Sequence, residues 1–434
     1  MTALEAMLKR HHWLEEMIAP LNVCQRKAFA NLVDDNNVFL TGGAGTGKTY
    51  VIHKFIEMMI KLGVHVPVVA STGAAAILAG GQTFHRFFSL NVATDVEALV
   101  NNALAKPYTW DKIRKVRCLI LDEVSMLPSY ALEAAYTIAQ RVKNSDEPWG
   151  GIKVIAVGDF RQLPPVVKRG EGATPWAFLS SAWEESGFSP SLLKTPVRSV
   201  DPEFVEILGD ARIGKLTDRI AKFLDSKTVG PDAPDDYPRL FGKKIDVENY
   251  NVSKLNQLSG ADTVFHTEYS GVERYIDDLR KEAPIPEMLV LRKGALVMMR
   301  QNDKDDRFVN GSLGHVRDIS PISVTVDLLS GTTVSVGLGT FMYNNEMGDV
   351  LATAKNFPMT LAWATTIHKS QGATLDKVLL DLKRLWEPGQ LYVALSRVRS
   401  PDGVKIVQWD RHAFKKDHKV SEFHKNLLEQ VEKI

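Results

Sequence analysis

The chain has 434 residues, and its 53 Lys and Arg residues almost balance 52 Asp and Glu residues. A chain of this length can bury a sizeable core and is expected to form roughly two to four domains. The even charge excludes a global positive field for a polyanionic partner, so any nucleic-acid contact must be local. Cys24 and Cys118 are the only cysteines, which excludes a four-cysteine metal site and argues against a disulfide framework.

Residues 1–20 mix acidic with apolar residues and predict a short amphipathic helix. Their composition is typical of neither a signal peptide nor a transit peptide. No run in the sequence approaches the ~18 apolar residues that a membrane span needs. We therefore expect a cytoplasmic protein with reduced cysteines.

Residues 37 to about 190 alternate short apolar runs with amphipathic helical stretches. Each run is short enough for a strand buried on both faces of a parallel sheet, so the pattern predicts a doubly wound α/β lobe. Residues 91–115 lack strand character and are expected to form a small insertion beside this lobe. The apolar runs are 37–40, 66–70, 117–122 and 151–159, and the helical stretches are 49–62, 73–80 and 131–143.

The second half of the chain changes pattern twice. A second lobe is predicted to start near Lys194, with a loop rich in Pro, Asp and Gly at 226–244. From Gly294 to about Met347, short alternating segments separated by turn residues predict a small β-barrel-like insertion. Apolar runs at 377–382 and 404–410 then predict strands of the second lobe.

The first chemical motif is a phosphate loop of the form GxxxxGK[ST], placed between an apolar run and a helical stretch. Glycines let the backbone N–H groups curl around a phosphate, and the helix that follows presents its positive end. Lys48 supplies a mobile charge, and Thr49 is expected to hold Mg²⁺. The residues predicted to bind the nucleotide here are Gly43, Ala44, Gly45, Thr46, Gly47, Lys48 and Thr49.

Two carboxylates and an amide follow two other predicted strands. Asp122 suits the magnesium shell and Glu123 suits the base that activates the attacking water, because ligand chemistry gathers at the carboxyl ends of parallel strands. Gln162 can sense a γ-phosphate by hydrogen bonding without adding charge. Taken alone, the acidic pair could be a solvated strand end, and the segment around Gln162 could be a surface loop ended by proline.

Four segments together resemble the superfamily 1 group B helicases, and most closely the petite-integration-frequency (PIF) helicase family in a compact bacterial or phage-type form. The resemblance implies an α/β fold of two RecA-like P-loop lobes, 1–193 and 194–434. It also implies a wedge insertion at about 85–115 and an SH3-like insertion at about 300–358. The segments are DEVSML, PWGGIKVIAVGDFRQLPPV, TTIHKSQGATLDKVLLDL and GQLYVALSRV.

The resemblance adds nucleotide contacts that the residues alone do not indicate. It implies that Asn22 and Gln25 recognise adenine and that Gly372 lies at the nucleotide. It further implies that Arg198 and Arg397 reach the γ-phosphate from the second lobe, where guanidinium groups stabilise the transition state. Without the resemblance, either arginine would be taken for a surface ion-pair residue.

The resemblance also implies a track for single-stranded DNA across both lobes. Small polar groups and backbone amides suit phosphate contacts that ignore sequence, and rings can stack on bases. The alternative for the aromatic pair Phe87 and Phe88 is a place in the core. The residues implied are Thr72, Gly73, Thr83, His85, Phe87 and Pro164 in the first lobe, and Thr366, His368, Lys369 and Gln371 in the second.

The function expected from the resemblance is ATP-dependent 5′→3′ unwinding by a monomeric motor that uses ATP and Mg²⁺ in a bacterial or phage-infected cell. Its partners would be single-stranded DNA and forked or tailed duplexes, with roles in DNA repair, recombination or telomere maintenance. Two alternatives stay open: a RecD-like motor subunit of a recombination nuclease, and an ATP-dependent regulatory switch that is not a motor.

Overall fold

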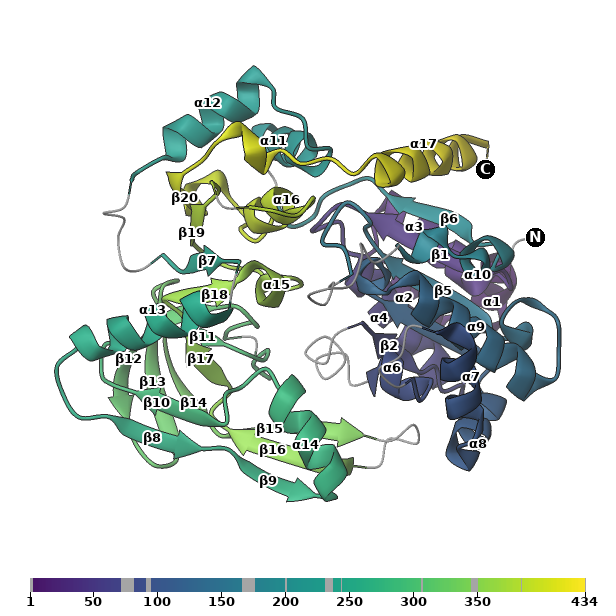
Figure 1. Cartoon of the computed structure of the whole chain (residues 1–434), viewed down its shortest axis with the longest axis horizontal. Coiled ribbons are helices and arrows are strands. Elements are labelled where there is room, and N and C mark those ends of the chain that lie inside the picture. The colour runs from purple at the N-terminus through teal and green to yellow at the C-terminus, as the bar shows by residue number, and fades with distance from the viewer. Residues whose placement is uncertain are drawn as a thin grey trace. The chain divides into compact units, whose positions relative to one another are not determined.

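The computed structural model describes residues 3–71, 82–90, 95–165, 176–199, 201–230, 237–242, 244–305, 307–344, 350–383 and 385–433 (Figure 1). The chain divides into two compact units. The first unit contains Met1–Arg198 and Asp417–Ile434, and the second contains Ser199–Lys416. In these described ranges, no helix is both long and apolar enough to cross a membrane.

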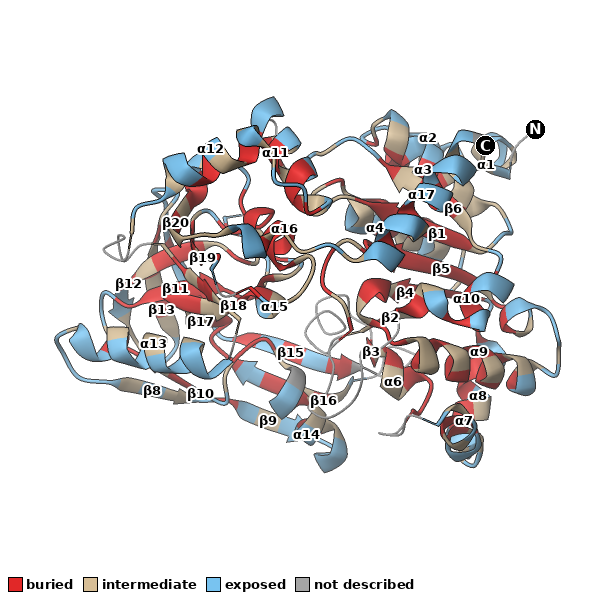
Figure 2. Cartoon of the chain, turned by 45° about the horizontal axis from the view of Figure 1, so that its top comes forward, coloured by how far each residue is buried: buried red, intermediate tan, exposed pale blue. Residues whose placement is uncertain are grey.

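A parallel sheet forms the centre of the first unit, as the sequence predicted. Its strands run in the order β3-β2-β4-β5-β1-β6, and every pair is parallel. Strands β1, β4 and β5 are almost entirely buried (Figure 2), which explains their unbroken apolar runs. The strands are β1 (Val38–Gly42), β2 (Val68–Ala70), β3 (Gln82–Thr83), β4 (Cys118–Asp122), β5 (Lys153–Gly158) and β6 (Ser189–Leu193).

Helices cover both faces of this sheet. Successive residues of β1 point to opposite faces, so Val38 and Leu40 join one apolar cluster while Phe39 joins the other. The described helices of the unit are α1 (Ala3–Arg10), α2 (Trp13–Ile18), α3 (Val23–Val33), α4 (Lys48–Lys61), α6 (Phe84–Phe87), α7 (Val96–Leu104), α8 (Pro107–Lys115), α9 (Ser129–Lys143), α10 (Ser181–Glu185) and α17 (His418–Lys433).

The second unit contains a smaller parallel sheet in the order β18-β7-β19-β20. The runs predicted at 377–382 and 404–410 form its last two strands. Its strands are β7 (Arg239–Phe241), β18 (Ala364–Thr366), β19 (Val378–Asp381) and β20 (Val404–Gln408), and its described helices are α11 (Pro202–Arg212), α12 (Asp218–Lys227), α13 (Lys244–Gln257), α14 (Glu273–Glu282), α15 (Ile367–Ser370) and α16 (Gln390–Leu395).

Antiparallel strands are inserted in the second unit. A five-stranded sheet runs β14-β13-β12-β11-β17, and two smaller sheets run β15-β16-β9 and β10-β8. Four of these strands, β8 to β11, precede the predicted range of 300–358 altogether, and each is only four residues long. The strands are β8 (Thr263–His266), β9 (Glu268–Gly271), β10 (Met288–Leu291), β11 (Leu296–Met299), β12 (Leu313–Ile319), β13 (Ser323–Leu328), β14 (Thr333–Gly337), β15 (Gly339–Asn344), β16 (Val350–Asn356) and β17 (Met359–Leu361).

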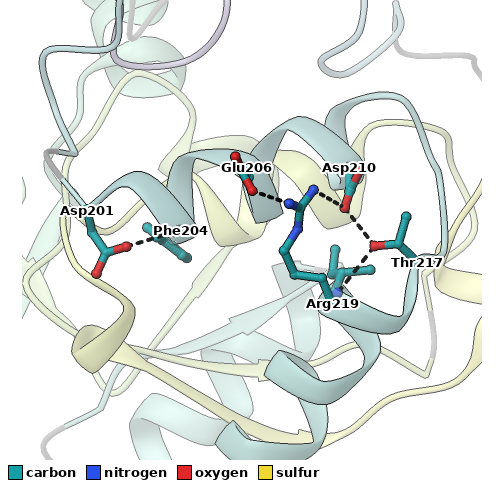
Figure 3. Close-up of polar contacts among 7 residues, drawn as sticks. Asp201, Phe204, Glu206, Asp210, Thr217 and Arg219 are labelled. Atoms are coloured by element: carbon teal, nitrogen blue, oxygen red, sulfur yellow. Dashed lines mark hydrogen bonds and ion pairs between the residues drawn. The ribbon is translucent and has the colours of Figure 1, made fainter.

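Helices α11 and α12 are joined by a polar network (Figure 3). The Arg219 guanidinium pairs with Glu206 and donates to Asp210 Oδ2 at 2.9 Å. Thr217 caps α12 and donates its hydroxyl to the same Asp210 oxygen at 2.7 Å. One carboxylate of α11 therefore holds both the cap and the first turn of α12.

Helix α17 belongs to the first unit, although it follows the second unit in the chain. The sequence assigned the whole of 194–434 to the second lobe, whereas the structure groups Asp417–Ile434 with the first unit. Helix α17 contacts β6 (Figure 1). Its residues Val420 and Leu427 are buried in an apolar cluster of that unit, and this long-range packing left no signal in the local pattern.

Candidate nucleotide and nucleic-acid sites

Three segments with candidate catalytic residues meet at one edge of the first sheet. Strand β5 lies between β1 and β4, with Thr41 opposite Gly158 and Leu121 opposite Ala156. Since the strands are parallel, the phosphate loop after β1, Asp159 after β5 and Asp122 at the end of β4 share the carboxyl edge. Open α/β sheets place their ligands at this edge.

The phosphate loop is closed by hydrogen bonds of its own side chains. The Lys48 ammonium donates to the carbonyl oxygens of Gly42 and Gly43 at 2.9 and 3.1 Å. The Thr46 hydroxyl donates to the Gly43 oxygen at 2.9 Å. Lys48 opens α4, and Thr49 follows it as an exposed residue of the first turn. The arrangement offers a cation and a helix N-terminus to an anion.

The acidic pair turns sharply at the end of β4. Asp122 accepts a hydrogen bond from its neighbour's backbone N–H at 2.9 Å. Glu123 itself has φ 50° and ψ 44°, a left-handed conformation that is uncommon for a residue with a side chain. Burial raises the pKa of Asp122, while the Glu123 N–H and the charge of Lys48 act against the rise. The positive charge of Lys48 therefore acts on the Asp122 carboxylate, although the two residues follow different strands.

The oxygen donors at this edge fit a magnesium ion. Mg²⁺ prefers hard oxygen ligands and is commonly held by one or two carboxylates together with substrate phosphates. Thr49 offers a hydroxyl, and Asp122 offers a buried carboxylate. A bound cation would offset the free-energy cost of burying that negative charge. No group of three or more His, Cys, Asp or Glu side chains suited to a metal occurs in the described residues.

Gln162 is held in a tight turn after β5. Its backbone N–H donates to the Asp159 carbonyl at 2.9 Å, and the Arg161 N–H donates to the Asp159 carboxylate at 3.1 Å. The Gln162 side chain is only 6% exposed. These bonds fix the backbone from which the Gln162 side chain extends. Pro164, implied as a DNA contact, follows in the same segment and is half-buried.

The two amides expected at adenine have other partners. Asn22 caps α3 by accepting from the Gln25 N–H at 2.9 Å, and Gln25 Oε1 accepts from the Asn22 N–H at 3.1 Å. Gln25 Nε2 donates to the Thr46 carbonyl at 3.2 Å, and the side chain is 4% exposed. The contacts seen make Gln25 a link between α3 and the phosphate loop. The N-x-x-Q spacing of a capping box is the sequence signal for this arrangement.

Arg198 lies beside the phosphate loop as the last residue of the first unit. Its backbone N–H donates to the Gly45 carbonyl at 3.0 Å, and the Val197 N–H donates to the same oxygen at 2.8 Å. The expectation that Arg198 comes from the second lobe is therefore corrected. The loop itself positions this arginine.

Arg397 is buried inside the second unit, with 1% of its side chain exposed. Its guanidinium donates to the carbonyls of Val393 at 2.7 Å, Ser370 at 3.0 Å and Ala373 at 3.3 Å, and to the Ser396 hydroxyl at 2.8 Å. These contacts make Arg397 a brace between α15 and α16, and its contact with the γ-phosphate stays a prediction. The brace also spans Gly372, which the resemblance placed at the nucleotide.

Three of the candidate DNA contacts of the first unit lie at the end of the edge strand β3 and in the helix after it. Thr83 ends β3 and precedes α6, which carries His85 as a half-buried residue. Phe87 is 1% exposed and packs edge-on against Phe88, so its expected role in stacking on a base is wrong in this conformation. Lys112 of α8 donates to the Phe87 carbonyl at 2.8 Å. Thr72 and Gly73 lie outside the described residues.

The candidate DNA contacts of the second unit gather around α15. Thr366 is buried and caps the helix by accepting from the Lys369 N–H at 3.0 Å. His368 Nε2 lies 3.6 Å from Glu387 Oε2. Gln371 follows the helix as its C-cap. Helix α15 thus keeps the candidate side chains close to one another. The Thr366 hydroxyl, however, is already used to cap the helix.

Two further basic residues, Lys244 and Arg300, act on the charge of Lys369. Arg300 is not among the residues predicted from the sequence. Burial lowers the pKa of Lys369, and the positive charges of Lys244 and Arg300 lower it further. Lys244 and Lys369 are exposed and can meet a phosphate backbone, whereas Arg300 is 9% exposed and donates to the Pro284 carbonyl at 3.1 Å. The signal was not local, because the three residues come from separate parts of the second unit.

Known proteins resemble this chain in sequence and in fold. A family model described as PIF1-like helicase matches residues 20–203. The ATP-dependent DNA helicase Pif1 of Bdellovibrio bacteriovorus is 44% identical over 404 residues, which cover 93% of this chain and 91% of that protein. The chain belongs to the PIF1-like helicase family. The PIF1 helicase of Danio rerio is 32% identical, with 92% of this chain and 63% of that longer protein covered.

Solved PIF1-family structures have the same fold. Bacteroides sp Pif1 in complex with ADP-AlF4 superposes with a TM-score of 0.82 at 29% identity, covering 94% of this chain and 97% of that one. Candida albicans Pif1 gives a TM-score of 0.74 at 33% identity, covering 94% and 99%. Bacteroides Pif1 bound to ssDNA gives 0.65 at 30% identity, covering 94% and 96%. The predicted pair of RecA-like lobes and the predicted family are thus confirmed.

Proposed function

We propose that this chain is an ATP-dependent DNA helicase that moves 5′→3′ along single-stranded DNA and unwinds forked or tailed duplexes. One observation supports this most strongly: Lys48, Gln162 and Asp122 lie at or after the ends of β1, β5 and β4, and the DNA candidates Thr83 and His85 lie at or after the end of β3 in the same sheet. Strand β2 pairs with β4, placing Ala70 beside both Asp122 and Thr83. Events at the phosphates and at the DNA therefore share one rigid edge.

The residues of the first unit divide the chemistry among them. Lys48 neutralises the β and γ phosphates, Glu123 orients and deprotonates the attacking water, and Gln162 reads the γ-phosphate through its amide. Arg198, beside the loop, adds a positive charge toward the phosphates. Thr49 and Asp122 would hold Mg²⁺, which neutralises phosphate charge when bound.

Directional stepping would follow from a difference in DNA affinity between nucleotide states. Each lobe grips the strand with its own polar residues, and the closed and open states favour different grips. In the second lobe, the exposed basic residues Lys244 and Lys369 would supply phosphate contacts. The enzyme would work as a monomer in the cytoplasm of a bacterial or phage-infected cell.

The first experiment measures ATP turnover with and without single-stranded DNA. Wild-type protein should be stimulated, and Lys48→Ala or Glu123→Gln should abolish turnover with the circular dichroism spectrum unchanged. A regulatory switch would respond to a partner protein and not to DNA. A RecD-like subunit would need its complex in order to unwind.

The second experiment compares duplexes that carry a 5′ or a 3′ single-stranded tail. Unwinding should require the 5′ tail and Mg²⁺, and EDTA should stop it. Unwinding from the 3′ tail alone would contradict the proposed polarity while leaving the ATPase assignment intact.

A further inference from the structure

The last helix of the chain packs against the turn that carries the γ-phosphate sensor. Along α17, Val420, Phe423, His424, Leu427 and Val431 recur at helical spacing and face one apolar cluster of the first unit. Four of these residues are apolar, and His424 is the exception. A buried imidazole on an otherwise apolar face calls for a polar neighbour.

That neighbour is the carboxylate of Asp159. His424 Nε2 lies 3.8 Å from Asp159 Oδ1, and both side chains are almost completely buried. The same oxygen accepts from the Arg161 N–H, while the Asp159 carbonyl accepts from the Gln162 N–H. The side chain that orients the Gln162 turn is therefore in contact with α17.

Phe423, the residue before His424 in α17, packs on the same turn. Its ring lies 5.2 Å from that of Phe160, edge to face, and 4.4 Å from that of Phe178, stacked. Phe160 stands between Asp159 and Arg161 in the sequence. Two adjacent residues of α17 thus contact two adjacent residues of the turn, one through a polar contact and one through ring packing.

The start of α17 is anchored to the first unit, and the residues just before it are anchored to the second. Asp417 accepts from the Trp176 indole at 2.9 Å and from the Val420 N–H at 3.1 Å. On the other side, a Cβ placed on Gly214 would lie 2.7 Å from the Lys415 carbonyl, which shows how closely Lys415 and Lys416 approach the end of α11. The anchors are nearly consecutive in the chain, so the connection has little slack.

We propose that α17 couples displacements of the second lobe to the Gln162 turn, with His424 and Phe423 as positioning residues. This inference rests on the proposed function and extends it. A short connection pulls on α17 when the second lobe moves, and α17 moves the turn through Asp159 and Phe160. The amide of Gln162 then meets the γ-phosphate only in one arrangement of the lobes.

The test measures DNA-stimulated ATP turnover in full-length variants. His424→Ala should lower kcat about tenfold, because a small misplacement of a catalytic group is costly. The KM for ATP and the affinity for a fluorescent ATP analogue should stay unchanged. His424→Gln, which keeps an N–H for the carboxylate, should restore most of the rate, and Lys425→Ala on the exposed side of α17 should behave as wild type.

A second variant changes no side chain at all. Inserting a short Gly-Ser segment between Lys416 and Asp417 adds slack while keeping both anchors. Basal turnover should persist, and stimulation by single-stranded DNA should fall toward the basal level. This variant decides the question if His424→Ala does not fold.

The outcomes separate the coupling from the proposed function. Wild-type kcat and full DNA stimulation in both His424→Ala and the insertion variant would overturn the coupling alone. A rise in KM that parallels a loss of thermal stability would also overturn it, because α17 would then be only structural. Wild-type protein without DNA-stimulated turnover would overturn the proposed function, and this inference with it.

Discussion

The side-chain amide of Gln25 donates to the Thr46 carbonyl at 3.2 Å and so ties the start of α3 to the phosphate loop. The same amide accepts from the Asn22 N–H and completes a capping box. One side chain therefore stabilises a helix end and fixes a loop that has to hold a phosphate. These two roles can be separated by mutation.

Gln25→Ala should weaken ATP binding and also lower the free energy of unfolding by about 1 kcal/mol, since a cap and a hydrogen bond are lost. Asn22→Ala removes the other half of the capping box and leaves the bond to Thr46. It should cost similar stability but leave the ATP affinity nearly unchanged. Equal losses of affinity in the two variants, measured by titration with a fluorescent ATP analogue, would contradict the role of the Thr46 bond.

Gly47→Ala should abolish nucleotide binding. Gly47 has φ +87°, and a Cβ there would collide with the Gln25 amide. The matched control is Gly63→Ala, where φ is +72° but nothing lies within 4 Å of the added carbon. Gly63→Ala should cost about 1 kcal/mol of stability through backbone strain alone, with ATP turnover retained. Turnover by Gly47→Ala at the rate of that control would show that the close approach to Gln25 is unimportant.

Stability in acid should depend on Asp210. Partial burial acts to raise the pKa of this carboxyl, but hydrogen bonds from Thr217 and Arg219 outweigh it and hold the pKa below its usual value. A carboxylate with a lowered folded pKa contributes stability above its unfolded pKa of about 3.9 and loses it as the pH falls through the folded value. The advantage of wild type over Asp210→Asn should therefore be constant above about pH 5 and shrink below about pH 4.

Urea unfolding at a series of pH values measures this difference. The control is Asp376→Asn, which changes an exposed carboxylate of the same unit. Its effect on stability should be small across the range. A difference between wild type and Asp210→Asn that grows as the pH falls would reverse the expected sign.

Phe87 and His85 should respond differently to truncation although they share α6. Phe87→Ala leaves a hole in the core and should cost about 3–5 kcal/mol of stability. His85→Ala should leave stability nearly unchanged and weaken binding of single-stranded DNA. Thermal unfolding and fluorescence anisotropy with a labelled oligonucleotide separate the two effects. A stable Phe87→Ala protein with a specific DNA defect would restore the stacking role that its burial argues against.

The parts of the site that could be predicted from the sequence are those where chemistry and local structure coincide. Lys48, Asp122 and Gln162 each follow an apolar run, and a parallel sheet brings the ends of such runs together. Phe87 and Arg397 could not be placed in this way, because burial depends on elements far away in the sequence. For the same reason, the packing of α17 could not be predicted. Its apolar residues recur at helical spacing, but Phe160, against which it packs, lies in another part of the chain.

For Arg397, a role as a brace and a role as a γ-phosphate contact predict different effects of mutation. The four hydrogen bonds of its guanidinium described above all end on groups of the second unit, and three of them are to carbonyl oxygens. Arg397→Ala leaves those carbonyls buried without their donor, so it should lower the free energy of unfolding by about 3 kcal/mol. Arg397→Lys should recover only part of this, because a single ammonium cannot reproduce the planar fork of donors.

The matched control for Arg397 is Arg399→Ala, which removes an exposed guanidinium two residues further on. It should leave stability within about 0.5 kcal/mol of wild type. Urea unfolding and ATP turnover should be measured on the same preparations. A brace predicts that Arg397→Ala loses stability with and without ATP, whereas a γ-phosphate contact predicts wild-type stability and a fall in kcat only. The second result would mean that the guanidinium leaves its carbonyl partners during the catalytic cycle.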